Sequence, residues 1–266
     1  MLLQYNTSIA TPKGLMNFNG SDSEDLFKTN LQKLPSDWKY RTEHITYAFN
    51  SNGYRAPEWD SIDWQESIVV LGCSNVFGTG LSNEDTIPFQ LQEILKRPVI
   101  NLGMSGTGAD YQYWNLVRLF QNNIKVKKIL VLWPHPARFM YFKKPGIVDS
   151  VQVKNLDLED VTIKSKNRQL VEDYLLNLSH WYHNFEQTVN AANMLYPDIV
   201  NYYYNGVFKH YDLKLPGYDS THKGIMDPNI YKDPMNYNIM SRDGEHFGTD
   251  LIKNITIPHI LSRLDI

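Results

Sequence analysis

Residues 67–80 read SIVVLGCSNVFGTG, and this stretch decides the fold. A short apolar run closed by Gly72 is typical of a buried strand, and the glycine-rich segment behind it predicts a tight turn into a helix. We therefore expect the hydroxyl of Ser74 at the carboxyl end of a strand. Open α/β sheets bind their ligands at this end.

The rest of the chain continues to alternate short apolar runs with amphipathic stretches. Strands alternating with helices predict an α/β protein with a parallel sheet and helices on both faces. The expected strands are residues 67–71, 99–102, 128–133 and 198–204, and the expected helices are residues 87–95, 111–121, 168–195 and 249–264. Within the last of these, Pro258 predicts a kink or a break.

Two regions interrupt this alternation. Residues 1–66 are polar and rich in turn signals such as Asn19-Gly20, so we expect an N-terminal extension with little regular structure, packed on a core domain of residues 67–266. Residues 134–167 carry several prolines and little periodicity, which indicates an insertion or lid near the strand ends.

The composition excludes several classes of protein. The 266 residues fit one large domain, and a net charge of −3 gives no electrostatic reason to bind nucleic acid or an anionic membrane. A single cysteine rules out an internal disulfide framework and a cysteine-based zinc site. No apolar run approaches the ~18 residues of a membrane span, and the N-terminus does not resemble a signal peptide. We expect a soluble intracellular or cytoplasmic protein; the alternative location is a viral particle. The sequence does not determine the oligomeric state.

A serine, a histidine and an acid suggest nucleophilic catalysis. Serine needs a base to take its proton, and the base needs a third group to orient it. Ser74 could be the nucleophile, His246 the base and Asp243 the acid, because Asp243 precedes His246 by three residues. The alternatives are a helix N-cap for Ser74 and a surface turn for the other two. Asp219 and His222 have the same spacing, but only His246 leads directly into the final helix.

The order of four sequence blocks resembles the SGNH (GDSL-like) hydrolase family. These blocks are Asn52-Gly53-Tyr54-Arg55, IVVLGCSNVFGTGL at residues 68–81, Asn101-Leu102-Gly103-Met104-Ser105-Gly106 and Asp243-Gly244-Glu245-His246. The resemblance implies a three-layer α/β/α sandwich with a parallel sheet of flavodoxin-like topology. It also implies a serine esterase without metal or organic cofactor, in which Ser74 is the nucleophile, His246 the general base and Asp243 its orienting acid. The backbone N–H groups of Ser74 and Gly106 would form the oxyanion hole.

Two positions depart from the family pattern. Cys73 stands where the family has aspartate; it is a second candidate nucleophile, although a lone cysteine at a strand end is more often a small buried hydrophobe. Residues 132–136 read LWPHP, so His135 stands where the family places an asparagine that donates to the oxyanion. A histidine N–H can serve as such a donor. Arg138 is another candidate donor, although a loop arginine is more often solvated or salt-bridged.

Other candidates have simpler explanations. His180 and His183 lie three residues apart on an expected helix with no third ligand, which favours packing over a metal site. Tyrosines 202–204 suit either a sugar pocket or a half-buried strand. The glycines of residues 103–108 do not have the spacing of the dinucleotide fingerprint, so we expect no nucleotide cofactor.

The sequence therefore predicts a serine esterase acting on a small-molecule or carbohydrate ester with a short-chain acyl or acetyl group. Two alternatives remain. Cys73 and His135 favour a catalytically impaired binding or structural module of the same fold. A water-excluding lid at residues 134–167 would instead favour an O-acyltransferase, in which a sugar hydroxyl replaces water as the acceptor.

Overall fold

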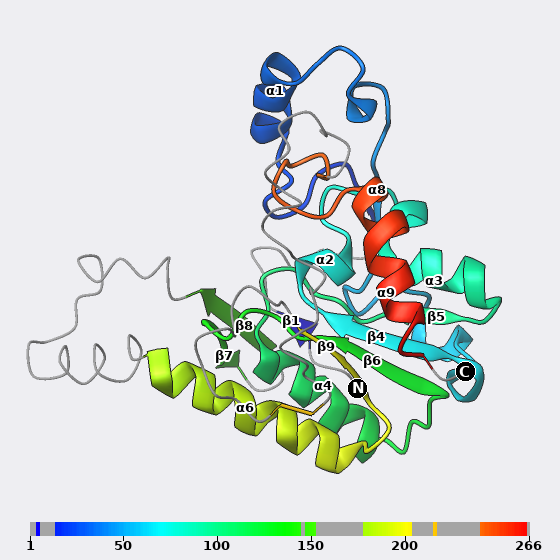
Figure 1. The fold of residues 1–266 in the computed structure, drawn as a ribbon, viewed down its shortest axis with the longest axis vertical. Helices are drawn as coiled ribbons and strands as arrows, with labels where there is room; N and C mark the ends of the chain where they lie inside the picture. Colours follow the sequence, from blue (N-terminus) through cyan, green and yellow to red (C-terminus); the bar gives the residue numbers. More distant parts are fainter. Residues whose placement is uncertain are drawn as a thin grey trace, which may run out of the picture.

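A four-stranded parallel sheet forms the centre of the structure (Figure 1). Its order is β5 (Val99–Asn101), β4 (Ile68–Gly72), β6 (Lys128–Leu132) and β9 (Val200–Tyr202), and every neighbouring pair is parallel. The predicted α/β class with a parallel sheet is confirmed. This computed structural model describes residues 4–5, 14–144, 147–152, 178–203, 215–216 and 240–264.

The strand order determines where a ligand site can form. The first strand of the sheet in sequence is β4; β5 pairs on one side of it, and β6 followed by β9 lie on the other. Connections leaving β4 and β6 therefore diverge, and in open α/β sheets a crevice lies at the carboxyl ends of such a strand pair. Ser74 follows β4 and His135 follows β6, so both lie at the edge of the sheet where ligands bind in folds of this kind.

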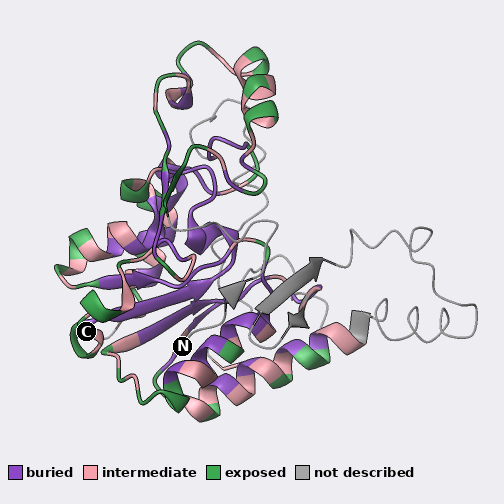
Figure 2. Ribbon diagram, turned by 180° about the vertical axis from the view of Figure 1, so that it is seen from behind, coloured by how far each residue is buried: buried purple, intermediate pink, exposed green. Residues whose placement is uncertain are grey.

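The central strand is apolar on both faces because helices cover both. All five residues of β4 are buried. Val69 and Leu71 share a core cluster with residues of α4 (Ala109–Gln121) and α6 (Leu178–Leu195). Ile68 and Val70, which point the other way because strand side chains alternate, pack with α3 (Ile87–Leu95) and α9 (Ile257–Leu261). Figure 2 shows the buried residues concentrated on the sheet and on the helix sides that face it. The expected helix at residues 168–195 is observed from Leu178 onward, and residues 168–177 lie outside the described part.

The closing helix changes its winding before the proline. Helix α8 (Thr249–Leu251) runs into a π-helical segment, η8 (Ile252–Thr256), and then into α9, whose second residue is Pro258. Proline has no N–H to donate, and π-helical turns are one of the recognised causes of helix bending. The predicted interruption thus takes the form of a wider turn. In the described ranges, no helix combines the length and apolar character needed to span a membrane.

The N-terminal region contains more regular structure than the sequence predicted. Helix α1 (Glu24–Lys33) begins with the Ser23 hydroxyl accepting a hydrogen bond from the Leu26 N–H, and two acidic residues occupy its first turn. These are favourable features of a helix start. Strands β2 (Gly14–Met16) and β3 (Tyr47–Phe49) form an antiparallel pair. The remaining elements are η1 (Lys39–Arg41), η2 (Trp59–Ser61) and η3 (Trp64–Glu66).

This region packs against the parallel sheet. Trp38, Tyr40, Tyr47 and Phe49 belong to the same buried cluster as the α3 face of the sheet. Stacked rings connect β3 to Phe77, which lies in α2 (Ser74–Phe77). The domain boundary at residue 66 stays a prediction.

Part of the expected insertion at residues 134–167 forms a hairpin. Strands β7 (Arg138–Lys144) and β8 (Ile147–Gln152) are antiparallel, and β1 (Gln4–Tyr5) pairs with β8 in a second sheet. Aromatic residues in β7 suit a strand, but the prolines around this segment indicate irregular structure in the sequence. Residues 153–167 lie outside the described part, so the lid stays a prediction.

Candidate active site

Ser74 occupies the turn that follows the first strand of the sheet. It is the first residue of the short helix α2 and is buried, with 4% of its surface exposed. The turn requires glycine at its start, because a Cβ on Gly72 would lie 2.4 Å from Val76 Cγ2. The chain therefore turns closely enough to keep Ser74 at the carboxyl end of β4.

Asp243 and His246 form a hydrogen-bonded acid–base pair. The Nδ1 atom of His246 lies 2.6 Å from Asp243 Oδ2. The other carboxylate oxygen, Oδ1, accepts from the Ser241 hydroxyl at 2.7 Å and from the N–H groups of Glu245 and His246 at 3.0 and 3.1 Å. These contacts fix the carboxylate within its own loop and leave Nε2 of His246 as the ring nitrogen turned away from the acid.

The protonation of this pair suits a base supported by a carboxylate. Burial alone would raise the pKa of Asp243, but the hydrogen bond and charge of His246, with the bonds from Glu245 and Ser241, lower it to about 2. Burial acts to lower the pKa of His246, but the hydrogen bond and negative charge of Asp243 outweigh it and raise that pKa. Asp243 is therefore ionised at neutral pH and stabilises a protonated imidazole.

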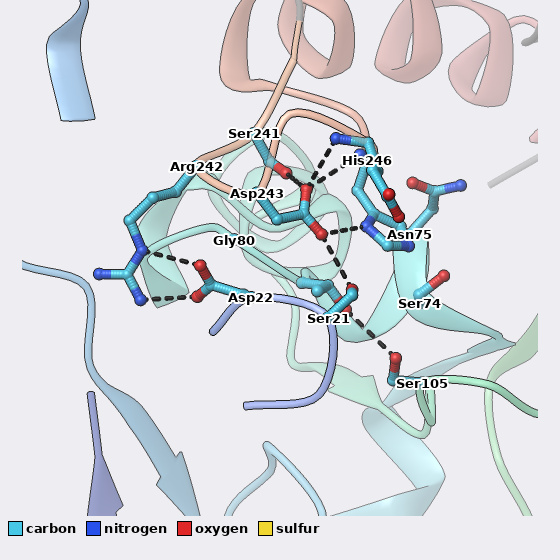
Figure 3. Close-up of polar contacts among 12 residues, drawn as sticks. Ser21, Asp22, Ser74, Asn75, Gly80, Ser105, Ser241, Arg242, Asp243 and His246 are labelled. Carbon is cyan, nitrogen blue, oxygen red and sulfur yellow. Dashed lines mark hydrogen bonds and ion pairs between the residues drawn. The ribbon is translucent and has the colours of Figure 1, made fainter. Parts of the chain in front are cut away.

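Two hydrogen bonds join the serine turn to the acid–base loop. The Asn75 side-chain oxygen accepts from the Phe247 N–H at 3.1 Å, and the Gly80 carbonyl accepts from the Arg242 N–H at 3.0 Å. Ser74 directly precedes Asn75, and His246 directly precedes Phe247. The hydrogen bond between Asn75 and Phe247 therefore brings Ser74 and His246 into the same region of the structure. Figure 3 shows the imidazole between the Asp243 carboxylate and the Ser74–Asn75 segment.

The serine hydroxyl does not reach the histidine in this state. Among the described residues, Ser74 Oγ donates to Cys73 Sγ at 3.7 Å and makes no hydrogen bond with His246. Cys73 is buried, as expected for a cysteine at this position. A general-base step requires the hydroxyl to turn from Cys73 to Nε2 of His246.

The other expected oxyanion donors lie on the loops that follow β5 and β6. Gly106 has a φ of +82° and is exposed, a conformation that favours glycine. His135 Nδ1 accepts from the Ala137 N–H at 3.0 Å. A neutral His135 ring consequently carries its proton on Nε2. The roles of Ser74, Gly106 and His135 in an oxyanion hole stay predictions.

The guanidinium group of Arg138 differs from the solvated or salt-bridged state that is usual for an arginine in a loop. Its Nε and Nη1 atoms are buried and have no hydrogen-bond partner among the described residues, so this arginine is neither solvated at those atoms nor salt-bridged there. Its carbonyl oxygen lies only 2.5 Å from where a Cβ on Gly108 would be, which places its backbone beside the loop that contains Gly106.

The remaining candidates have structural roles or cannot be placed. Nε2 of His180 and of His183 lies within hydrogen-bond distance of the side-chain amide four residues on. The hydroxyls of Tyr202 and Tyr203 donate to backbone carbonyls, which explains both tyrosines without a sugar pocket. In the part of the chain that the structure describes, no three histidine, cysteine or acidic residues are grouped to hold a metal ion. Residues 204, 219 and 222 lie outside that part.

Three residues near the acid–base pair were not expected from the sequence. The Ser21 hydroxyl donates to Asp243 Oδ2 at 3.0 Å. Next to it, Asp22 accepts from Arg242 Nε and Nη2 at 2.9 and 2.6 Å in a buried ion pair. These partners are separated by 220 or more residues. Asn19-Gly20 marked a turn in the sequence, but nothing local indicated what that turn would contact.

The chain has distant likeness to known proteins. No family model matches its sequence, and no curated protein matches it. A solved structure from Desulfitobacterium hafniense DCB-2, described as "a putative lipolytic protein of G-D-S-L family", aligns with 13% sequence identity and a TM-score of 0.36. The alignment covers 75% of this chain and 100% of that one. A score this low carries no argument about the site, so the function has to be argued from the residues themselves.

Proposed function

We propose that the protein is a serine ester hydrolase in which Ser74, His246 and Asp243 act together. The observation that carries the proposal is the 2.6 Å bond between His246 Nδ1 and Asp243 Oδ2 in a loop tied to the Ser74 turn. A buried serine next to an imidazole whose far nitrogen is held by a carboxylate is the arrangement that nucleophilic acyl transfer requires. The SGNH-like order of the sequence blocks adds to it.

In the first half of the proposed reaction, Nε2 of His246 takes the Ser74 proton while Ser74 Oγ attacks the ester carbonyl carbon. Asp243 remains ionised and stabilises the imidazolium that forms, consistent with its pKa of about 2. The imidazolium then gives its proton to the departing alcohol oxygen, and the acyl group stays on Ser74. In the second half, His246 takes a proton from a water as the water oxygen attacks the acyl carbon. The imidazolium then returns that proton to Ser74 Oγ as the bond between Oγ and the acyl carbon breaks, which releases the acid and restores the serine.

Negative charge on the carbonyl oxygen has to be stabilised during both halves. We assign this role to the N–H groups of Ser74 and Gly106 and to Nε2–H of His135. Gly106 and His135 begin on loops at the carboxyl ends of β5 and β6, on either side of the strand that precedes Ser74. Such donors act strongly because they are fixed before the charge develops.

The proposal includes the fold and the substrate. Helices on both faces of a sheet ordered β5-β4-β6-β9 support a three-layer sandwich of flavodoxin-like topology. For the substrate, we favour a short-chain acyl or acetyl ester, including one on a carbohydrate. No strongly apolar segment of the sequence surrounds the motifs, and polar or aromatic walls suit a hydrophilic ester better than a lipid.

A panel of nitrophenyl esters with acyl chains of increasing length tests the activity. We expect measurable hydrolysis that is fastest for acetate and is abolished in Ser74→Ala, because no acyl-enzyme can form without the nucleophile. Equal rates for the wild-type protein and Ser74→Ala across the panel would contradict the esterase proposal and favour the alternative function. That alternative, a binding module of the same fold, is favoured by one observation: the Ser74 hydroxyl bonds to Cys73 rather than to His246.

A further inference from the structure

A tight turn in the N-terminal region approaches the candidate active site. Asn19 and Asp22 exchange two backbone hydrogen bonds, at 3.0 and 3.2 Å, around Gly20 and Ser21. Gly20 has a φ of +62°, whereas the φ of Ser21 is negative. This is the pattern of a type II′ turn, in which glycine occupies the first central position. The turn places Ser21 at its tip and Asp22 at its base.

Consecutive residues of this turn contact consecutive residues of the acid loop. Ser21 bonds to Asp243 and Asp22 to Arg242 (Figure 3). The hydroxyl of Tyr47 joins them to the serine turn, because it donates to Asp22 Oδ2 at 2.5 Å and accepts from the Gly80 N–H at 2.8 Å. The buried ion pair thus fixes the register in which Ser21 meets Asp243.

The turn also borders the loop with the expected oxyanion donor. A Cβ on Gly20 would lie 3.8 Å from the Ser105 hydroxyl, and Ser105 precedes Gly106. Ser105 Oγ in turn accepts from Thr79 Oγ1 at 3.4 Å. Residues 20 and 21 therefore lie between the acid loop and the loop after β5, although they precede both by a long stretch of sequence.

The Ser21 hydroxyl completes the coordination of the acid. Asp243 Oδ1 accepts three hydrogen bonds from its own loop, whereas Oδ2 accepts, among the residues that the structure describes, only from His246 and Ser21. A donor on Oδ2 orients the carboxylate toward the imidazole and withdraws part of its charge. Ser21 itself is exposed while the Asp243 side chain is fully buried, so the residue covers the acid from the solvent side.

We propose that Ser21 is a positioning residue for the acid–base pair, and that the turn of residues 19–22 is part of the active site. This inference rests on the proposed function for its effect on rate, but not for its effect on His246. Loss of the hydroxyl leaves more negative charge on Oδ2, which favours the imidazolium and raises the pKa of His246. It also loosens the orientation of the ring, which lowers the rate of proton transfer from Ser74.

A pair of nearly isosteric substitutions isolates the hydroxyl. Ser21→Thr keeps the donor, and Ser21→Val replaces it with a methyl group of similar size that cannot donate a hydrogen bond. Titration of the His246 ring nitrogens by NMR, assigned with a His246→Gln spectrum, reads the pKa directly. We expect the pKa to rise in Ser21→Val and to stay at the wild-type value in Ser21→Thr. Ser21→Ala serves if the valine variant does not fold.

The same variants are then assayed for ester hydrolysis. We expect Ser21→Val to lower kcat by about twofold to tenfold with KM unchanged, which is the range of one hydrogen bond's net contribution, and Ser21→Thr to restore it. Superimposable His246 titrations in wild type, Ser21→Val and Ser21→Thr would overturn the proposal. If no variant, including wild type, hydrolyses an ester, the proposed function fails, yet the titration still decides whether Ser21 acts on His246.

Discussion

Replacing Asp22 with asparagine removes a charge from the buried pair that anchors the acid loop. Asp22 is fully buried and the Arg242 side chain is 5% exposed. The carboxylate accepts three hydrogen bonds, two from Arg242 and one from Tyr47. An amide has one acceptor oxygen, so at least one donor faces an N–H₂ group, and the guanidinium charge is left without its counter-ion. Breaking a buried ion pair by removing one partner costs about 3–5 kcal/mol, and we expect a loss of that size in the free energy of unfolding.

Urea unfolding followed by circular dichroism measures this loss, with the slope of the transition as a check that the unfolded state is unchanged. Glu24→Gln is the matched control, because it neutralises an acid two residues away whose pair with Lys28 is exposed. Surface pairs of this kind contribute little. A typical protein has only about 5–15 kcal/mol of stability, so the two variants should be easily distinguished. An Asp22→Asn protein as stable as Glu24→Gln would refute the anchoring role.

Three further predictions concern the rate of ester hydrolysis. His135→Ala should lower kcat by about 10²–10³, the cost of losing one oxyanion donor; an unchanged kcat removes His135 from that role. Gly106→Ala places a side chain on a residue with a φ of +82°, so we expect about 1–3 kcal/mol of backbone strain and a lower kcat. A variant with the stability and kcat of the wild-type protein would contradict the role of Gly106. Because general-base catalysis needs neutral imidazole and the pKa of His246 is raised, kcat/KM should rise with pH to a plateau with its midpoint above 6.5. A midpoint at or below 6.5 contradicts this.

The sheet was predictable because its strands are buried on both faces. The strands expected at residues 67–71 and 128–133 are apolar at nearly every position, and each matches an observed strand to within one residue at either end. Helix α3 has the bounds that its apolar spacing predicted. These elements depend on local pattern, which the sequence displays directly.

The N-terminal region and the hairpin were less predictable because neighbours distant in sequence stabilise them. Tyr47 and Phe49 stack on Phe77 of α2, and β8 has the two residues of β1 as a partner. A polar segment with frequent turns gives little periodic signal of its own. In the N-terminal region, packing partners that are distant in sequence decide the structure.

The residues of the candidate site also fall into two groups: those in local sequence motifs, and those that reach the site through contacts distant in sequence. Ser74, Asp243 and His246 lie in short motifs next to a strand or a terminal helix, so sequence alone singled them out. Ser21 and Asp22 reach the site through a turn whose partners lie at residues 242 and 243. No motif at either end predicts that contact, and only the folded chain reveals it.

Labelling by an active-site-directed fluorophosphonate tests the central claim most directly. The reagent phosphonylates a serine only when a neighbouring base activates it, and intact-mass and peptide analysis then locate the adduct. We predict one adduct, on Ser74, that is lost in Ser74→Ala and retained in Cys73→Ala. Absence of an adduct from the wild-type protein, or an adduct that persists in Ser74→Ala, would contradict the assignment of Ser74 as an activated nucleophile.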